Sequence, residues 1–249
     1  MTQAVEIATE VAIKAPPQKE KQETEHLLTF QEYLAYEGEP DVLYELFKGQ
    51  LIPMSSPSLS HTKICEFLTY KLQRYFADKN LGLVAKTTVG VRTDENTSRI
   101  PDAIVCQQSL WEEISDRPGA GVLDFAEKPI LVVEIVSTNR RNDYIIKRFE
   151  YEVAGIAEYW IVDPKKKRVK VYRYLDDEEG YACVDFEEDS SIISGQFEQL
   201  DLSVKELLNP PVVEDLIKDE QAKIKTLEQR AEKLAERLRE MGVNPDELD

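Results

Sequence analysis

The chain is poor in the residues that build soft-metal and redox sites. Its 249 residues include two histidines and three cysteines, which are Cys65, Cys106 and Cys183. The cysteines are widely spaced and form no CxxC pair, so we expect reduced, packed thiols and no zinc centre of the His/Cys type. A GxxxxGK[ST] loop is missing as well, which argues against a nucleotide-hydrolysing enzyme.

Long apolar runs are also missing. No stretch approaches the length of a membrane span, and the N-terminus lacks the basic and apolar regions that mark a secretory signal. We therefore expect a cytoplasmic protein with no membrane partner. Residues 1–25 are polar and contain Pro16-Pro17, a composition typical of a disordered leader.

Basic residues are outnumbered, and the formal net charge is −17. Most of the excess lies in residues 176–249, which hold 22 acidic and 8 basic side chains. Residues 26–175 hold 21 acidic and 20 basic ones, so the net charge does not exclude nucleic acid as a partner of this part. Two basic clusters lie there: Arg140, Arg141, Lys147 and Arg148, and then Lys165-Lys166-Lys167-Arg168 with Lys170 and Arg173.

The spacing of apolar residues predicts both helices and strands over residues 26–208, the pattern of an α/β (α+β) domain. Thr29 and Glu32 match the capping box of a short helix, and Lys48-Gly49 predicts the turn of a hairpin. Ser60 is the expected cap of the following helix. Further elements are expected as a helix from about 61 to 77, a strand pair near 83–88 and 89–93, a loop over 107–128, a helix over 143–153, strands over 158–162 and 168–174, and a hairpin within 180–200.

The remaining residues, 209–249, form a separate segment after Pro210-Pro211. A heptad repeat is apolar except at Glu220 and has charged flanks, which favours a coiled coil or helical pair. A single amphipathic helix packed on its own domain is the alternative. The a positions are Ile217, Ile224, Ala231 and Leu238, and the d positions are Val213, Glu220, Leu227, Leu234 and Met241.

Two carboxylates carry the best indication of function. Asp102 lies in the run 99–105 and Glu134 in the almost wholly apolar run 130–136, and each run predicts a strand. A carboxylate inside such a strand is strongly unfavourable unless it is paired, protonated or bound to a metal. Asp102 and Glu134 would suit Mg²⁺ or Mn²⁺, which prefer one or two carboxylates together with water and phosphate.

Each candidate residue also has a simpler interpretation. Asp102 follows a proline and fits an ordinary turn, and Glu134 could pair with a buried arginine. Lys147 lies four residues after Asp143 and could form an exposed helical ion pair. Glu45 could be a strand residue that faces solvent, and His61 is most simply a first-turn helix residue.

The order of several short motifs resembles the Uma-type family, which belongs to the PD-(D/E)XK nuclease superfamily and is widespread in cyanobacteria. The resemblance covers about residues 28–205. It is carried by the run from Tyr44 to Ser55, Pro57-Ser58 with His61, Val89-Gly90-Val91-Arg92, Pro101-Asp102, Pro129 to Ser137, Arg140-Arg141-Asn142-Asp143, Tyr151, Ala154-Gly155, Glu158-Tyr159-Trp160 and Val162-Asp163-Pro164.

This resemblance implies a restriction-endonuclease-like core, in which a mixed central sheet is flanked by helices, with a magnesium-dependent site. Asp102 and Glu134 would be the metal ligands, and Glu45 would match an upstream acidic residue that completes the site as a further ligand or base. Val136 stands where the superfamily motif has a lysine on the strand, and Lys147 matches a lysine that has moved to the following helix.

The leading hypothesis is therefore an endonuclease that hydrolyses DNA with Mg²⁺ or Mn²⁺, acting as a homodimer or higher homo-oligomer. A catalytically inactive scaffold or oligomerising interaction module with the same fold is the alternative. A glycosidase would also use two carboxylates, but the chain has few aromatic residues for a sugar cleft and gives Lys147 no role.

Overall fold

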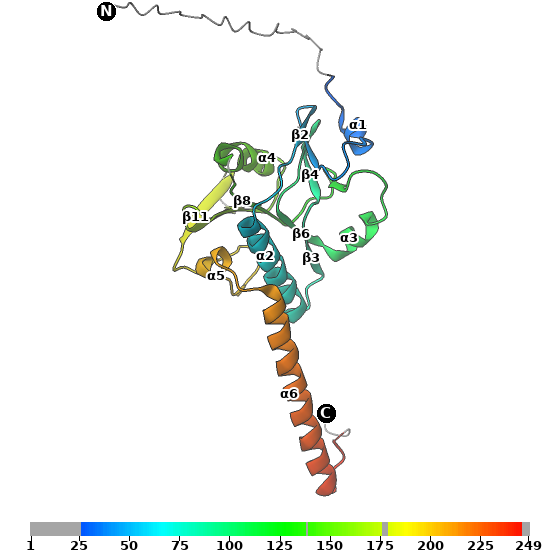
Figure 1. Ribbon diagram of the computed structural model, residues 1–249, viewed down its shortest axis with the longest axis vertical. Helices are drawn as coiled ribbons and strands as arrows, with labels where there is room; N and C mark the ends of the chain where they lie inside the picture. Colours follow the sequence, from blue (N-terminus) through cyan, green and yellow to red (C-terminus); the bar gives the residue numbers. More distant parts are fainter. Residues whose placement is uncertain (1–25, 138, 176–178, 246–249) are drawn as a thin grey trace, which may run out of the picture.

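The computed structural model describes residues 26–137, 139–175 and 179–245. Helices and strands are interspersed along these residues, and the strands form two sheets (Figure 1). The arrangement confirms the predicted mixed α/β class with a C-terminal helix. The leader predicted for residues 1–25 lies outside the described residues.

The larger sheet positions most of the candidate site. Its order is β11-β10-β9-β8-β6-β3. The central strands β8 (Leu131–Ile135) and β9 (Glu158–Asp163) are parallel and buried along their whole length, as the apolar run around Glu134 predicts. The other pairs are antiparallel. Those strands are β3 (Leu83–Lys86), β6 (Ala103–Gln107), β10 (Arg168–Tyr174) and β11 (Tyr181–Glu187).

The smaller sheet has the order β2-β1-β5-β4-β7. Lys48 and Gly49 have φ of 51° and 83°, the positive values that a tight hairpin turn requires. This confirms the predicted hairpin of β1 and β2. Arg99 ends β5, and the chain then crosses to β6 of the larger sheet. The strands are β1 (Tyr44–Phe47), β2 (Gln50–Pro53), β4 (Gly90–Asp94), β5 (Thr97–Arg99) and β7 (Val122–Leu123).

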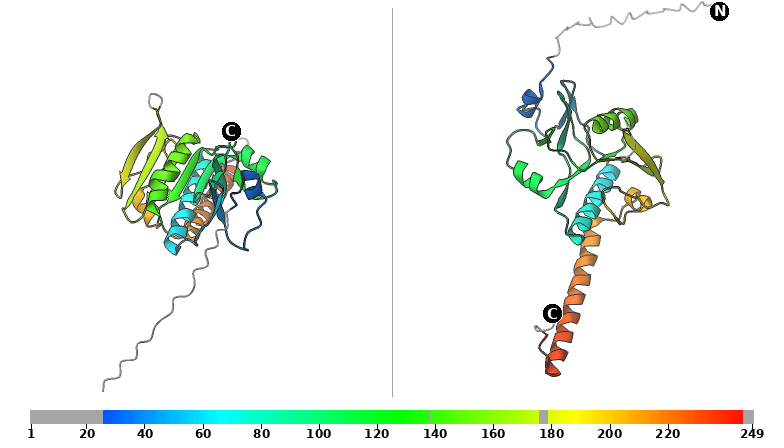
Figure 2. Two further views of the ribbon diagram at one scale, coloured as in Figure 1. Left: turned by 90° about the horizontal axis from the view of Figure 1, so that it is seen from above. Right: turned by 180° about the vertical axis from the view of Figure 1, so that it is seen from behind.

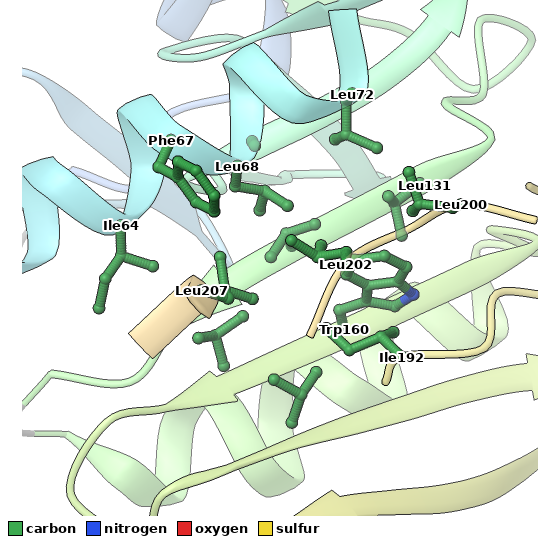
Figure 3. Close-up of a cluster of buried hydrophobic side chains, with 14 of the residues drawn as sticks. Ile64, Phe67, Leu68, Leu72, Leu131, Trp160, Ile192, Leu200, Leu202 and Leu207 are labelled. Atoms are coloured by element: carbon green, nitrogen blue, oxygen red, sulfur yellow. The ribbon is translucent and has the colours of Figure 1, made fainter. Parts of the chain in front are cut away.

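Helices cover both faces of the larger sheet. The helix α2 (Leu59–Asp78) and the short α5 (Val204–Leu208) lie on one face, where Phe67 and Leu68 point toward Trp160 and the neighbouring leucines (Figure 3). The opposite face packs Val132 and Ile161 against Tyr151, beneath a π-helical turn η1 (Asn142–Lys147) that continues into α4 (Arg148–Val153). The remaining short helices are α1 (Phe30–Leu34) and α3 (Gln108–Ile114).

Several local predictions are wrong. Ser58, and not Ser60, caps α2 by accepting a hydrogen bond from the backbone N–H of His61. The expected strand pair over 83–93 does not form, because β3 pairs with β6 and β4 pairs with β5 and β7 in the other sheet. The expected loop over 107–128 contains α3 and β7.

The three cysteines are free, but they are not all packed. Cys106 is buried in β6, and the half-buried Cys65 donates from its thiol to the carbonyl of Asp102 at 3.2 Å. Cys183 is exposed on β11, which is an edge strand of the larger sheet, so the prediction of a packed thiol is wrong there.

The C-terminal helix α6 (Val213–Glu240) begins against the body and then extends away from it (Figures 1 and 2). It contacts α2 near its beginning. Among the described residues, no helix combines the length and the apolar character needed to cross a membrane.

Candidate functional site

The register of the larger sheet brings Asp102 and Glu134 to neighbouring strands. Ala103 of β6 lies opposite Val133 of β8. One position earlier, the backbone N–H of Asp102 donates to the carbonyl of Val133 at 3.1 Å. The Asp102 carboxylate accepts a hydrogen bond from the backbone N–H of Ile135 at 2.6 Å. The two candidate carboxylates are therefore fixed by adjacent strands.

The strand predicted over 99–105 is interrupted at Asp102. β5 ends at Arg99 and β6 begins at Ala103, so Asp102 occupies the bend that joins the two sheets. The Pro101-Asp102 pair explains the break, because proline donates no hydrogen bond to a strand ladder.

Glu134 lies on the face of β8 that is covered by η1 and α4. Residues 131, 133 and 135 join the core beneath α2, whereas Val132 and Val136 join the opposite core together with Tyr151. The alternation of a strand therefore directs Glu134 toward Tyr151 and Lys147. Its Oε1 accepts from the Lys147 ammonium at 2.8 Å and from the Tyr151 hydroxyl at 3.0 Å.

Lys147 links the two sheets. Its Nζ lies 3.0 Å from Glu45 Oε1 and 2.8 Å from Glu134 Oε1, and the residue is only 5% exposed. The exposed ion pair with Asp143 that the sequence allowed is therefore wrong. Lys147 ends the π-helical turn and Tyr151 follows one turn later on the same face, which explains how both side chains reach Glu134.

Glu45 is buried between Lys147 and Arg99 and does not face solvent. Its Oε2 accepts from Arg99 at 3.0 Å, and its Oε1 also accepts from the backbone N–H of Ile100 at 3.1 Å. Arg99 donates in addition to both carboxylate oxygens of Glu150 on α4, at 2.6 and 2.8 Å. Arg99 and Glu150 thus hold β1, β5 and α4 together behind the candidate site.

His61 and Asp143 also border the site. The Nε2 of His61 lies 3.1 Å from Asp102 Oδ1, so His61 is more than a first-turn helix residue. Asp143 is 7% exposed, and its carbonyl accepts from the Tyr159 hydroxyl at 3.0 Å. Its carboxylate is close enough to Lys147, Asp102 and Glu45 for these charges to affect its pKa.

The electrostatics of the site reflect an excess of buried negative charge. Burial, together with the charges of Asp102, Asp143 and Glu45, raises the pKa of Glu134 to about 8 against the attraction of Lys147. Burial likewise raises the pKa of Asp143 to about 6. Three carboxylates, those of Glu134, Glu45 and Asp143, therefore act on the single ammonium of Lys147.

The other ionisable groups respond to the same charges. Burial disfavours the charged forms of both Lys147 and Glu45, but their mutual attraction outweighs it. The pKa of Lys147 is raised by Glu134 and Glu45, and the pKa of Glu45 is lowered by Lys147 and Arg99. The hydrogen bond to Asp102 raises the pKa of His61.

The donor set fits a hard divalent cation held by two carboxylates. The excess negative charge on hard oxygen atoms favours Mg²⁺ or Mn²⁺ over a soft metal. Among residues 26–137, 139–175 and 179–245, no cluster of three or more His, Cys, Asp or Glu side chains has the geometry of a metal site. A cation here would therefore be completed by water or a substrate phosphate, as is usual for Mg²⁺.

The structure brings together all four residues that the sequence singled out, Asp102, Glu134, Lys147 and Glu45. Sequence reasoning missed the contributions of His61, Asp143 and Tyr151. The sequence does contain a signal for Asp143 and Tyr151. Together with Lys147 they are spaced by four residues, so they share one face of a helix. Arg99 and Glu150 carry no comparable signal, since their pairing depends on the packing of α4 against β5.

Comparison with known proteins identifies a matching family model and solved structures of similar fold. A family model described as "Uma2: Putative restriction endonuclease" matches residues 30–205. The fold is similar to a solved structure from Anabaena variabilis ATCC 29413, titled as "a putative nuclease belonging to DUF820". The TM-score is 0.58 with 22% sequence identity, and the match covers 73% of this chain and 98% of that chain. A comparison with curated proteins found no match.

Proposed function

This chain belongs to the Uma2 family, and on that premise we propose that it is a divalent-metal-dependent endonuclease that hydrolyses the phosphodiester bonds of DNA. The observation that carries the proposal is the convergence of Asp102, Glu134 and Lys147. They come from a bend, a central strand and a helical turn, yet they form one cluster in which Glu134 and Lys147 are buried and Asp102 is partly exposed.

In this proposal Asp102 and Glu134 hold Mg²⁺ or Mn²⁺. The bound cation would polarise the scissile phosphoryl group and lower the pKa of a coordinated water. The hydrogen bond from Ile135 and the contact with His61 orient Asp102, while Tyr151 orients Glu134. Such supporting bonds fix the ligand geometry of metal sites.

Lys147 has the role of the superfamily lysine. Its pKa is raised, so it stays an ammonium group that can orient the attacking water and offset the charge that develops on the phosphate. Glu45 is the expected further ligand or base. Its bonds to Lys147, Arg99 and the Ile100 N–H favour a positioning role, in which it holds Lys147 close to Glu134.

DNA is the proposed substrate because basic residues border the cluster. Arg141 follows β8, and Lys165 and Lys166 follow the parallel neighbour β9, so these three exposed residues lie beyond the same ends of adjacent strands, whereas Arg140 is paired with Asp163. Exposed cations in this position would contact phosphates. Cleavage of both strands of a duplex is simplest with two active sites, so the proposal includes a homodimer.

A plasmid-cleavage assay tests the proposal. We expect the protein to nick or linearise supercoiled DNA with Mg²⁺ or Mn²⁺ and to be inactive in EDTA. Asp102→Asn and Glu134→Gln should each reduce the rate by at least about a hundredfold, corresponding to the loss of a principal electrostatic contact. Glu187→Gln, an exposed change on β11, is the control and should keep full activity.

Two results would contradict the nuclease proposal. Equal cleavage by wild type and by the Asp102→Asn/Glu134→Gln double variant would place the activity elsewhere or in a contaminant. A folded wild-type protein that neither cleaves DNA nor binds Mn²⁺ in low-salt calorimetry would instead favour the scaffold or interaction module.

A further inference from the structure

The helix α6 has two parts with different surroundings. At its beginning, Val213 is buried in the main core and Leu216 packs against it. One turn later, Glu220 Oε1 accepts from the Tyr70 hydroxyl at 2.8 Å and lies 3.0 Å from Arg74 Nε, both on α2. Glu220 therefore interrupts the heptad repeat because it binds the body of its own chain.

Beyond Glu220 the heptad residues have no such cover. Ile224, Leu227, Leu234 and Met241 are between 53% and 73% exposed, and the helix projects from the body (Figures 1 and 2). We call this set the distal seam, and it consists of Ile224, Leu227, Ala231, Leu234, Leu238 and Met241.

The distal seam has little local support as a single helix. In the described part of α6, no salt bridge forms between side chains of residues 221–240, and the one within the helix joins Lys218 to Asp215. In proteins, most of the stability of a helix comes from packing its apolar face against another surface. A contiguous exposed apolar stripe of this kind marks an interaction surface.

We propose that the distal seam pairs in parallel with the same seam of a second copy, as a two-stranded coiled coil. Its first a position is Ile224, and its next d positions are Leu227 and Leu234. A β-branched residue at a with leucine at d favours two parallel strands. The inference builds on the proposed homodimer, but it does not depend on the proposed metal site or catalysis.

The charged residues that flank the distal seam favour a parallel orientation of the two helices. The g positions Lys223, Arg230 and Arg237 are all basic, and Glu228 occupies an e position. In a parallel pair, g faces the e position of the next heptad on the partner, so each Lys223 meets a Glu228. An antiparallel pair would place g beside g and bring the basic residues together, which is unfavourable.

Cysteine crosslinking shows directly whether the two helices are parallel or antiparallel. In a Cys183→Ser background, which removes the exposed native thiol, Ile224→Cys and Met241→Cys are made singly. A parallel pair brings identical positions together, so each variant should form a disulfide-linked dimer under mild oxidation. Gln229→Cys on the outer face is the matched control and should stay uncrosslinked. Crosslinking only in a mixture of the two variants would show an antiparallel pair and overturn the proposal.

Light scattering on the full chain tests the seam and the charge pairing. Wild type should have the mass of two chains, and Leu227→Asp should weaken dimerisation by at least about a hundredfold, since two buried leucines are lost per dimer. Gln229→Asp should leave the mass unchanged.

Exchanging the charges at residues 223 and 228 also distinguishes a parallel from an antiparallel dimer. Lys223→Glu should weaken a parallel dimer and would strengthen an antiparallel one, and adding Glu228→Lys should restore the parallel dimer. A monomeric wild type would overturn this inference. Mn²⁺ binding and DNA cleavage by the same sample would still report independently on the proposed nuclease.

Discussion

The buried carboxylate of Glu134 makes the stability of the metal-free protein depend on pH. Its pKa is about 8 in the folded protein against an ordinary value of 4.5, so between these values the folded state binds a proton that the unfolded state has released. The free energy of unfolding must then fall as pH rises through this window, by up to about 1.4 kcal/mol per pH unit.

The window from pH 6.0 to 7.5 is the best place to measure this effect. It begins at the folded-state pKa of Asp143, about 6, and ends below that of Glu134, about 8. A full slope would destabilise the protein by about 2 kcal/mol, which corresponds to a fall in Tm of about 4–8 °C for a domain of this size. Glu134→Gln removes the titrating group and should remove most of this fall.

Thermal melting in EDTA at constant ionic strength is the assay, and Glu187→Gln is the matched control. His61 also has a raised pKa and contributes a slope of the same sign, so the comparison is the difference between wild type and Glu134→Gln. Mn²⁺ should raise the Tm of wild type more at pH 7.5 than at pH 6.0, because it binds the charged carboxylate. Equal slopes for wild type and Glu134→Gln in EDTA would refute the argument.

The other predictions concern Lys147, the arginine behind the candidate site and the basic residues proposed to bind DNA. Lys147→Met should abolish DNA cleavage while calorimetry still detects Mn²⁺, since both proposed ligands remain; full cleavage would remove Lys147 from the mechanism. Arg99→Met should lower the free energy of unfolding by about 3 kcal/mol or more in urea melts, because it leaves Glu45 and Glu150 without their arginine. Replacing Lys165 and Lys166 by Glu should weaken DNA binding in low-salt anisotropy titrations and reduce its salt dependence, whereas Lys218→Glu on α6 should leave both unchanged.

Strongly patterned elements could be predicted from the sequence, whereas pairings between distant segments could not. The apolar run around Glu134 predicts a buried central strand, and Lys48-Gly49 predicts the hairpin. The partner of β3 could not be found in the same way, because a strand's apolar residues do not identify the sheet that accepts it. The sequence around Asp102 predicts an unbroken strand, because local composition does not show that the chain changes sheets at this residue.

The residues of the candidate site also divide into those that the local sequence identifies and those that only the folded chain brings together. Asp102 and Glu134 stand out in the sequence because each carboxylate is flanked by apolar residues. Lys147 does not, since its burial depends on η1 packing over β8 and on Glu45 arriving from a different sheet. The network of Arg99 and Glu150 depends wholly on tertiary packing and is visible only in the folded chain.

Because Lys147 lies on a helical turn, the spacing of the two carboxylates and the positive charge that compensates them depend on different elements. The spacing of Asp102 and Glu134 is set by the ladder between β6 and β8, whereas the compensating positive charge is carried by η1. A movement of η1 directly away from β8 by about 1.5 Å, the rise of one α-helical residue, would lengthen the 2.8 Å contact with Glu134 beyond hydrogen-bonding distance. The balance of charge at the cluster can therefore change, in evolution or in motion, while the sheet and its two carboxylates stay as they are.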